Sequence, residues 1–96
     1  MIKKIFKKNK PVKTMTWQQE REIFLLEGAY KVITMACKSL RFDYNEELVL
    51  LLKNEYDYEV NSENAEVYEW SLVFIETDAL KFLSKAEELK QQYYGK

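Results

Sequence analysis

The residues that could do chemistry in this 96-residue chain lack the partners that such chemistry needs. The sequence contains no histidine, so the commonest general base and metal ligand at neutral pH is missing. Its serines therefore cannot form a Ser-His-Asp triad. The single cysteine, Cys37, cannot form an internal disulfide or a thiolate metal cluster. Because it lies in the apolar segment 33–37, we expect it to be buried as a packing residue.

Sixteen carboxylates are the remaining candidates for acid-base or metal chemistry. Their spacing does not match the calcium loop of an EF-hand or another metal-binding motif. The pairs Glu46–Glu47 and Glu87–Glu88 are typical of exposed helix surfaces. With two glycines and one proline, the chain also lacks a phosphate-binding glycine-rich loop. We therefore expect a protein that is not an enzyme, with no catalytic residues, cofactor, metal or small-molecule substrate.

Charge divides the chain into a basic arm and an acidic body. Residues 1–13 contain no acid, whereas residues 42–80 contain eleven acids and a single base, Lys53. The arm predicts contact with nucleic acid phosphates or with an anionic membrane surface, and a solvated tail that binds nothing is the plain alternative. Its six lysines are Lys3, Lys4, Lys7, Lys8, Lys10 and Lys13. The acidic stretch 43–78 could meet a basic partner, imitate the charge of nucleic acid or be a solvated face, and the acidic body repels DNA next to the arm.

The lengths of the apolar segments indicate the cellular location of the protein. The longest uninterrupted apolar run, over residues 48–52, is far shorter than the roughly 20 residues that span a bilayer. The basic start resembles the first part of a signal peptide, but no apolar stretch follows it. We therefore expect a cytoplasmic protein.

Helices must position these residues, because Gly28 is the only glycine or proline between Pro11 and Gly95. We predict one all-α domain over residues 14–96, a bundle-like arrangement of two long helices and one short helix, behind a flexible arm that ends at residue 13. Apolar residues spaced three and four apart predict the long helices. The three helices are expected at 17–40, 45–54 and 63–94.

Local signals support each helix. Thr16 and Gln19 form a capping box before the first helix, and the pattern from Asp43 to Glu46 resembles a second one. Two neighbouring apolar stripes follow the first helix, which suggests that it contacts two neighbours. The stripes are Ile23, Leu26, Tyr30, Ile33, Cys37 and Leu40, and beside them Leu25, Ala29, Val32 and Ala36. The last helix carries a seam of nine positions, namely Ala65, Tyr68, Leu72, Ile75, Ala79, Phe82, Ala86, Leu89 and Tyr93.

Residues 55–76 allow an alternative α+β fold. Residues 55–60 alternate strictly, and residues 66–76 are rich in side chains that favour strands. In that case the two segments form a β-hairpin, and the last helix starts at Thr77 or Asp78.

Helix lengths suggest a function. The middle helix would reach about 15 Å, whereas the outer helices would reach about 36 and 48 Å, so apolar surface would stay uncovered beside it. Large uncovered apolar patches mark interaction sites. We therefore expect an adaptor-type module that binds another protein or a second copy of itself, unless a break near Thr77 shortens the last helix. The residues expected at the interface are Val67, Trp70, Phe74, Tyr56 and Tyr58.

Two other functions remain open. One is binding of nucleic acid through the arm, and the other is attachment to a membrane surface. In size and in its partly basic character the chain is similar to the small helical-bundle immunity proteins of bacteriocin producers. That similarity lies at the level of the fold and rests on no shared motif.

Overall fold

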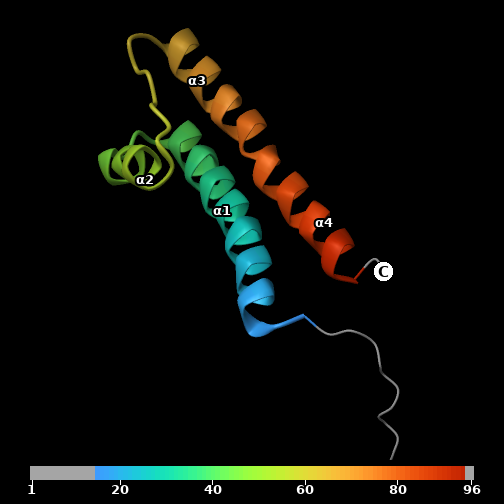
Figure 1. Cartoon of the computed structure of the whole chain (residues 1–96). Coiled ribbons are helices and arrows are strands. Elements are labelled where there is room, and N and C mark those ends of the chain that lie inside the picture. Colours follow the sequence, from blue (N-terminus) through green and yellow to red (C-terminus); the bar gives the residue numbers. More distant parts are fainter. Residues whose placement is uncertain (1–14, 95–96) are drawn as a thin grey trace, which may run out of the picture.

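All regular elements are helices in the computed structural model, which describes residues 15–94. They are α1 (Trp17–Phe42), α2 (Glu46–Tyr56), α3 (Ala65–Asp78) and α4 (Leu80–Tyr94). Only Ala79 separates α3 from α4, and the two continue along nearly the same line, so together they form one long bent helix (Figure 1). Helix α1 runs antiparallel beside this long helix, and α2 lies near the C-terminal end of α1. The prediction of an all-α fold with two long helices and one short helix is confirmed.

The helix ends follow local hydrogen-bonding chemistry. At the start of α1 the amide of Gln19 donates to Thr16 Oγ1 at 3.2 Å, and the amide of Thr16 donates to Gln19 Oε1 at 2.9 Å, as the capping box predicts. The cap of α2 differs from the prediction. Asn45 Oδ1 accepts the amide of Glu47 at 2.9 Å, whereas the amide of Asp43 donates to the carbonyl of Ser39 where α1 ends. Asp43 therefore belongs to the end of α1.

The alternative of a hairpin over residues 55–76 is wrong. Residues 65–76 are helical, residues 57–64 form an irregular connection, and no strand occurs within residues 15–94. Asn64 starts α3 by accepting the amide of Val67 at 2.9 Å. The strand-favouring side chains of this segment are overruled because Leu72 and Ile75 fit one helix face that packs on α1. The interruption at Ala79 is also too slight to turn the chain away from α1.

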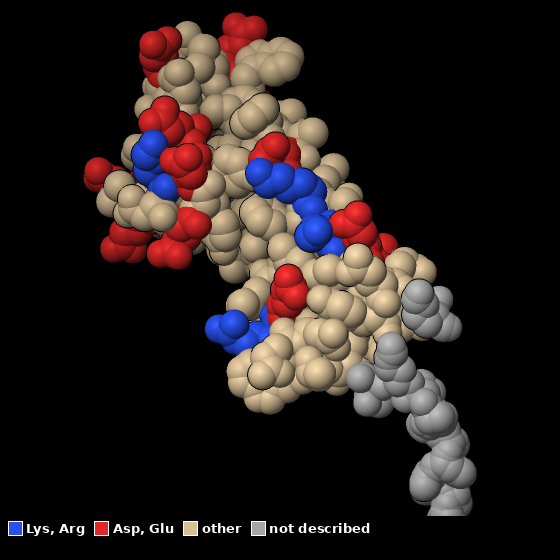
Figure 2. Space-filling view, viewed as in Figure 1, with Lys and Arg blue, Asp and Glu red and all other residues tan. Residues whose placement is uncertain are grey.

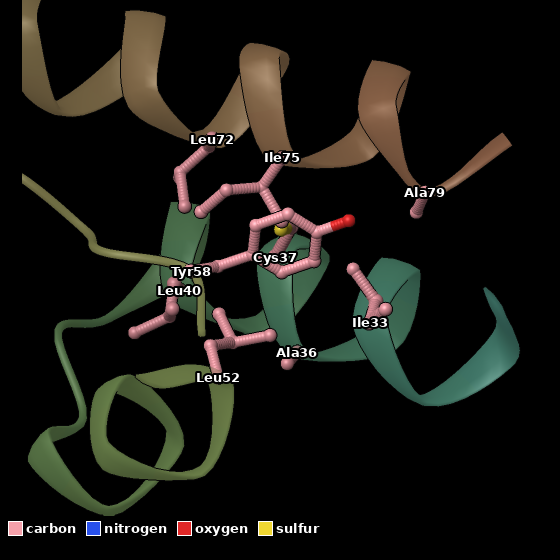
Figure 3. Close-up of a cluster of buried hydrophobic side chains, with 9 residues drawn as sticks. All are labelled: Ile33, Ala36, Cys37, Leu40, Leu52, Tyr58, Leu72, Ile75 and Ala79. Carbon is pink, nitrogen blue, oxygen red and sulfur yellow. The ribbon is translucent and has the colours of Figure 1, made fainter. Parts of the chain in front are cut away.

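The core consists of two clusters along the seam between α1 and the α3–α4 helix. The larger one, drawn in Figure 3, lies where α1, α2 and α3 meet. It contains Ile33, Ala36, Cys37, Leu40, Leu52, Tyr58, Leu72, Ile75 and Ala79. The smaller cluster joins the other end of α1 to α4 and contains Ile23, Ala86 and Leu89. The first predicted stripe of α1 and the long seam thus supply most of the core, although Ala65 of the seam is exposed. Of the second stripe of α1, only Ala36 is buried.

Polar contacts fix α1 to α3 next to the larger cluster. The guanidinium of Arg41 donates from Nε to Glu69 Oε2 at 2.9 Å. Its two terminal nitrogens donate to the two oxygens of Glu76 at 2.7 and 2.9 Å. The hydroxyl of Tyr68 donates to the carbonyl of Leu40 at 2.6 Å. These contacts hold the C-terminal part of α1 in register with α3.

Tyr58 ties the connection after α2 to the end of α3. Asp57 ends α2 with a left-handed φ of 62°, which lets the amide of Tyr58 donate to the carbonyl of Leu52 at 2.9 Å. The Tyr58 ring lies in the core, and its hydroxyl donates to Asp78 Oδ2 at 2.5 Å. Lys81 Nζ lies 2.9 Å from the same oxygen. The pKa of Asp78 is lowered mainly by the hydrogen bond from Tyr58 and secondly by Lys81. The pKa of Tyr58 is raised mainly by burial and secondly by Asp78.

These pKa shifts predict a loss of stability at both ends of the pH range. Asp78 has a lower pKa in the folded state, so its contribution is present above about pH 4, its unfolded pKa, and is lost as pH falls through the folded pKa. Tyr58 has a higher pKa in the folded state, so its contribution is complete below about pH 10 and is lost as pH rises through the folded pKa. Tyr58→Phe should therefore flatten both limbs of a plot of unfolding free energy against pH.

The exposed Tyr94 provides the control, since Tyr94→Phe should leave that plot unchanged. A Tyr58→Phe curve that runs parallel to the parent curve at both ends would mean that the hydrogen bond to Asp78 does not couple folding to pH.

Candidate interaction surface

Helix α3 carries large apolar side chains on the side turned away from α1. We call Trp70, Val73 and Phe74 the α3 outer face. Val73 and Phe74 follow Trp70 by three and four residues, which places the three side chains on one side of α3. Trp70 is 66% exposed and Phe74 is 64% exposed, while Leu72 and Ile75 on the opposite side are buried. The α3 outer face is therefore an apolar strip that no other helix of the described chain covers.

The charges around this strip are negative. Helix α3 contains no lysine or arginine, and Glu66 is exposed in its first turn. Glu69 and Glu76 lie on the side of α3 toward Arg41, which binds both carboxylates. A partner that covers the α3 outer face would thus meet apolar side chains with an acidic border.

Burial divides the five residues predicted to bind a partner. Trp70 and Phe74 stand exposed on the α3 outer face, and Val67 is half-buried near the start of the same helix. Tyr56 is half-buried and packs edge to face against Phe82, and Tyr58 is buried in the larger core cluster. The structure therefore separates the two tyrosines from the exposed aromatics of α3. Binding of a partner by any of the five stays a prediction.

A second apolar surface follows the side of α1 turned away from α4. We call Trp17, Phe24, Val32, Met35 and Phe42 the α1 outer face, and all five are exposed. Phe24 is 71% exposed. The sequence interpretation expected open apolar surface but did not name these residues as an interface, because it followed the stripes that it expected in the core. The signal was present, since Trp17, Phe24, Met35 and Phe42 recur at helical spacing outside those stripes, next to Val32.

The short α2 explains part of this exposure. It covers Ala36, which is buried, but the earlier members of the same stripe, Leu25 and Val32, remain exposed. A shallow groove between α1 and α2 is lined by Val32, Met35, Ala36, Ser39, Leu48 and Leu51. The expectation that a short middle helix leaves apolar surface open is thus confirmed for this side of α1.

Within residues 15–94, the reactive and metal-binding side chains form no cluster that could hold a metal ion. Cys37 is fully buried, as predicted. The pKa of its thiol is raised to about 12, mainly by burial and secondly by the charge of Glu76. The thiolate, which is the nucleophile, is therefore scarce at neutral pH. In the part of the chain that the structure describes, no three carboxylates or thiols are placed to hold a metal ion together.

The charged segments differ in what the structure says of them. The six lysines of the arm lie outside residues 15–94, so binding of nucleic acid or of an anionic membrane stays a prediction. The acids of the body gather over α2 and the connection that follows it (Figure 2). There Lys53 pairs with Glu59 at 3.1 Å and lies 3.6 Å from Asp57. This acidic region is exposed to solvent.

Comparisons with protein families, with curated proteins and with solved structures gave no match. Among the described helices, none is both long enough and apolar enough to cross a membrane. The chain is thus characterised by its helical fold and by two exposed apolar helix faces.

Proposed function

We propose that this protein is a non-catalytic interaction module that binds another protein through the α3 outer face. The observation that carries the proposal is the exposure of Trp70 and Phe74 on one side of a helix whose other side is firmly packed. Tryptophan is among the residues that contribute most to binding energy at protein interfaces, and phenylalanine is enriched there. The lack of histidine and the buried Cys37 thiol support a non-catalytic role.

The chemistry of the α3 outer face also describes the partner. Burial of the apolar side chains requires an apolar groove or helix face of similar length. Because the border of the α3 outer face is acidic and α3 has no basic residue, a partner with lysine or arginine beside its apolar surface is favoured. Trp70 and Phe74 would lie at the centre of this contact, and Val67 would lie at its edge.

Site-specific photo-crosslinking in the native host tests this proposal. We expect a photoreactive phenylalanine analogue at position 74 to give an adduct of discrete mass. The same analogue at position 94 replaces another exposed aromatic residue, far along α4, and should give none. Trp70→Ser should remove the adduct at position 74 without changing the helix content, because Trp70 is exposed.

The mass of the adduct identifies the class of partner. An adduct of twice the chain mass would indicate self-association through α3, and any other mass would indicate a different protein. Equal labelling from positions 74 and 94, or an adduct that Trp70→Ser leaves unchanged, would contradict the proposal.

A further inference from the structure

Gly28 lies in the middle of α1 at a place where the folded chain itself needs no glycine. A glycine inside a helix costs about 1 kcal/mol relative to alanine. A Cβ atom added to Gly28 would meet nothing within 4 Å, so no neighbouring part of the described chain approaches it closely. Gly28 follows Phe24 by four residues and precedes Val32 by four, which places it on the α1 outer face. Glycine at such a point lets the backbone of a second helix come close.

Two shallow hollows lie on α1 on either side of Gly28. The first is lined by Trp17, Glu20, Arg21 and Phe24. The second is the groove between α1 and α2 described above. Each lies about two helical turns from Gly28, one toward each end of α1. In Figure 1 no other helix covers the side of α1 below α2.

A second copy of the chain fits this arrangement when its α1 lies antiparallel, with Gly28 against Gly28. Phe24 of one copy then lies opposite Val32 of the other, and Trp17 lies opposite Ser39. The first hollow of each copy, with its two aromatic side chains, faces the apolar groove of the other. Because the arrangement has two-fold symmetry, every contact is made twice.

Charges at the edge of the α1 outer face agree with the same register. Glu20 and Lys38 are five helical turns apart, so they lie on the same edge of α1. In an antiparallel two-fold pair like edges meet, which brings Glu20 of each copy within about one turn of Lys38 of the other. Neither residue takes part in an ion pair within residues 15–94. The opposite edge is apolar, because Leu25 and Val32 lie there.

We propose that two copies of this chain form a homodimer in which their α1 outer faces pair antiparallel across Gly28. This surface is distinct from the α3 outer face, which stays free to bind another protein. The two proposals can therefore fail separately.

Sedimentation equilibrium of the full chain and its variants tests the dimer. We expect the full chain to show a monomer–dimer equilibrium. Gly28→Gln should raise the dissociation constant by at least about tenfold, because the longer side chain separates the two helices. The same change should leave the thermal midpoint of the monomer unchanged or higher, because glutamine favours helix more than glycine does. Ser84→Gln, on the exposed surface of α4, is the matched control and should leave the dimer intact.

Cross-linking tests the register. Under mild oxidation Gly28→Cys should form a disulfide between two copies, because the two positions 28 are the closest points of the helices. Ser84→Cys should form none at the same concentration, and the buried Cys37 should not interfere. A full chain that stays monomeric up to millimolar concentration, or a dimer that Gly28→Gln leaves unchanged, would overturn the proposal. A dimer that only Trp70→Ser disrupts would place self-association on α3 instead.

Discussion

Replacing Leu52 with alanine is expected to lower the free energy of unfolding by about 3 kcal/mol. Leu52 is fully buried, and it is the only residue of α2 that is. Its side chain extends from α2 into the larger core cluster (Figure 3). Truncation removes the contacts of the side chain and leaves a cavity that the surrounding helices fill only in part. Small domains of this kind have roughly 5 to 15 kcal/mol of total stability, so the loss is a large share.

Leu50→Ala is the matched control because it makes the same chemical change in the same helix at an exposed position. Its effect on the free energy of unfolding should stay below about 1 kcal/mol. Urea unfolding followed by far-ultraviolet circular dichroism measures both variants. Hydrogen exchange then shows whether the amides of α2 lose their protection before those of α1. Equal effects of the two substitutions would mean that α2 is not docked through Leu52.

Replacing Arg41 with methionine is expected to lower the free energy of unfolding by about 1 to 2 kcal/mol. Methionine retains a long apolar stem, so the change chiefly removes the charge and the forked hydrogen bonds to Glu69 and Glu76. The two carboxylates would then lie on one side of α3 without their shared counter-charge. The side chain of Arg41 is only 31% exposed, which keeps this contact stronger than a fully solvated ion pair.

Two further variants distinguish the forked geometry from simple charge. Arg41→Lys keeps the charge but cannot bind both carboxylates in the same way, so its stability should fall between those of the parent and Arg41→Met. Lys53→Met removes an exposed ion pair with Glu59 and should leave the urea midpoint unchanged. An Arg41→Met protein as stable as the parent would show that the contacts with Glu69 and Glu76 add nothing to folding.

The exposed aromatic residues are expected to matter for binding and little for folding. Leu52 and Leu72 are buried in the core between the helices, whereas Trp70 and Phe74 are exposed on the side of α3 turned away from that core. Substitutions on the α3 outer face should therefore change association without changing the unfolding midpoint. This separation allows the binding experiments to be read without a correction for misfolding.

The helices could be predicted from the sequence because periodicity and capping are local properties. Thr16 and Gln19 bond to each other across one turn, and the seam from Tyr68 to Tyr93 requires only the helical repeat. The choice of helix over strand for residues 65–76 was not local. It depends on packing of Leu72 and Ile75 against α1, which no segment of the sequence shows alone.

The candidate surfaces were predictable only in part for the same reason. Trp70 and Phe74 lie off the predicted seam, so their exposure follows from the sequence once the helix is accepted. Tyr56 and Tyr58 are also aromatic residues within the acidic segment, so the sequence did not distinguish them from Trp70. In the structure the connection after α2 turns Tyr58 into the core, where its hydroxyl donates to Asp78. A hydrogen bond between residues 20 positions apart depends on how the chain folds back.

By itself, then, the sequence predicted three helices, an acidic body, a buried cysteine and more apolar surface than a short middle helix can cover, but it left residues 55–76 open between helix and hairpin. The tertiary structure decided which apolar residues stay exposed to solvent. Helix α2 packs near one end of α1 and covers Ala36 but not Leu25, and α3 continues into α4 instead of folding back over its own outer face. The physical reason is that periodicity defines the faces of each helix, whereas burial depends on which other helix occupies each face.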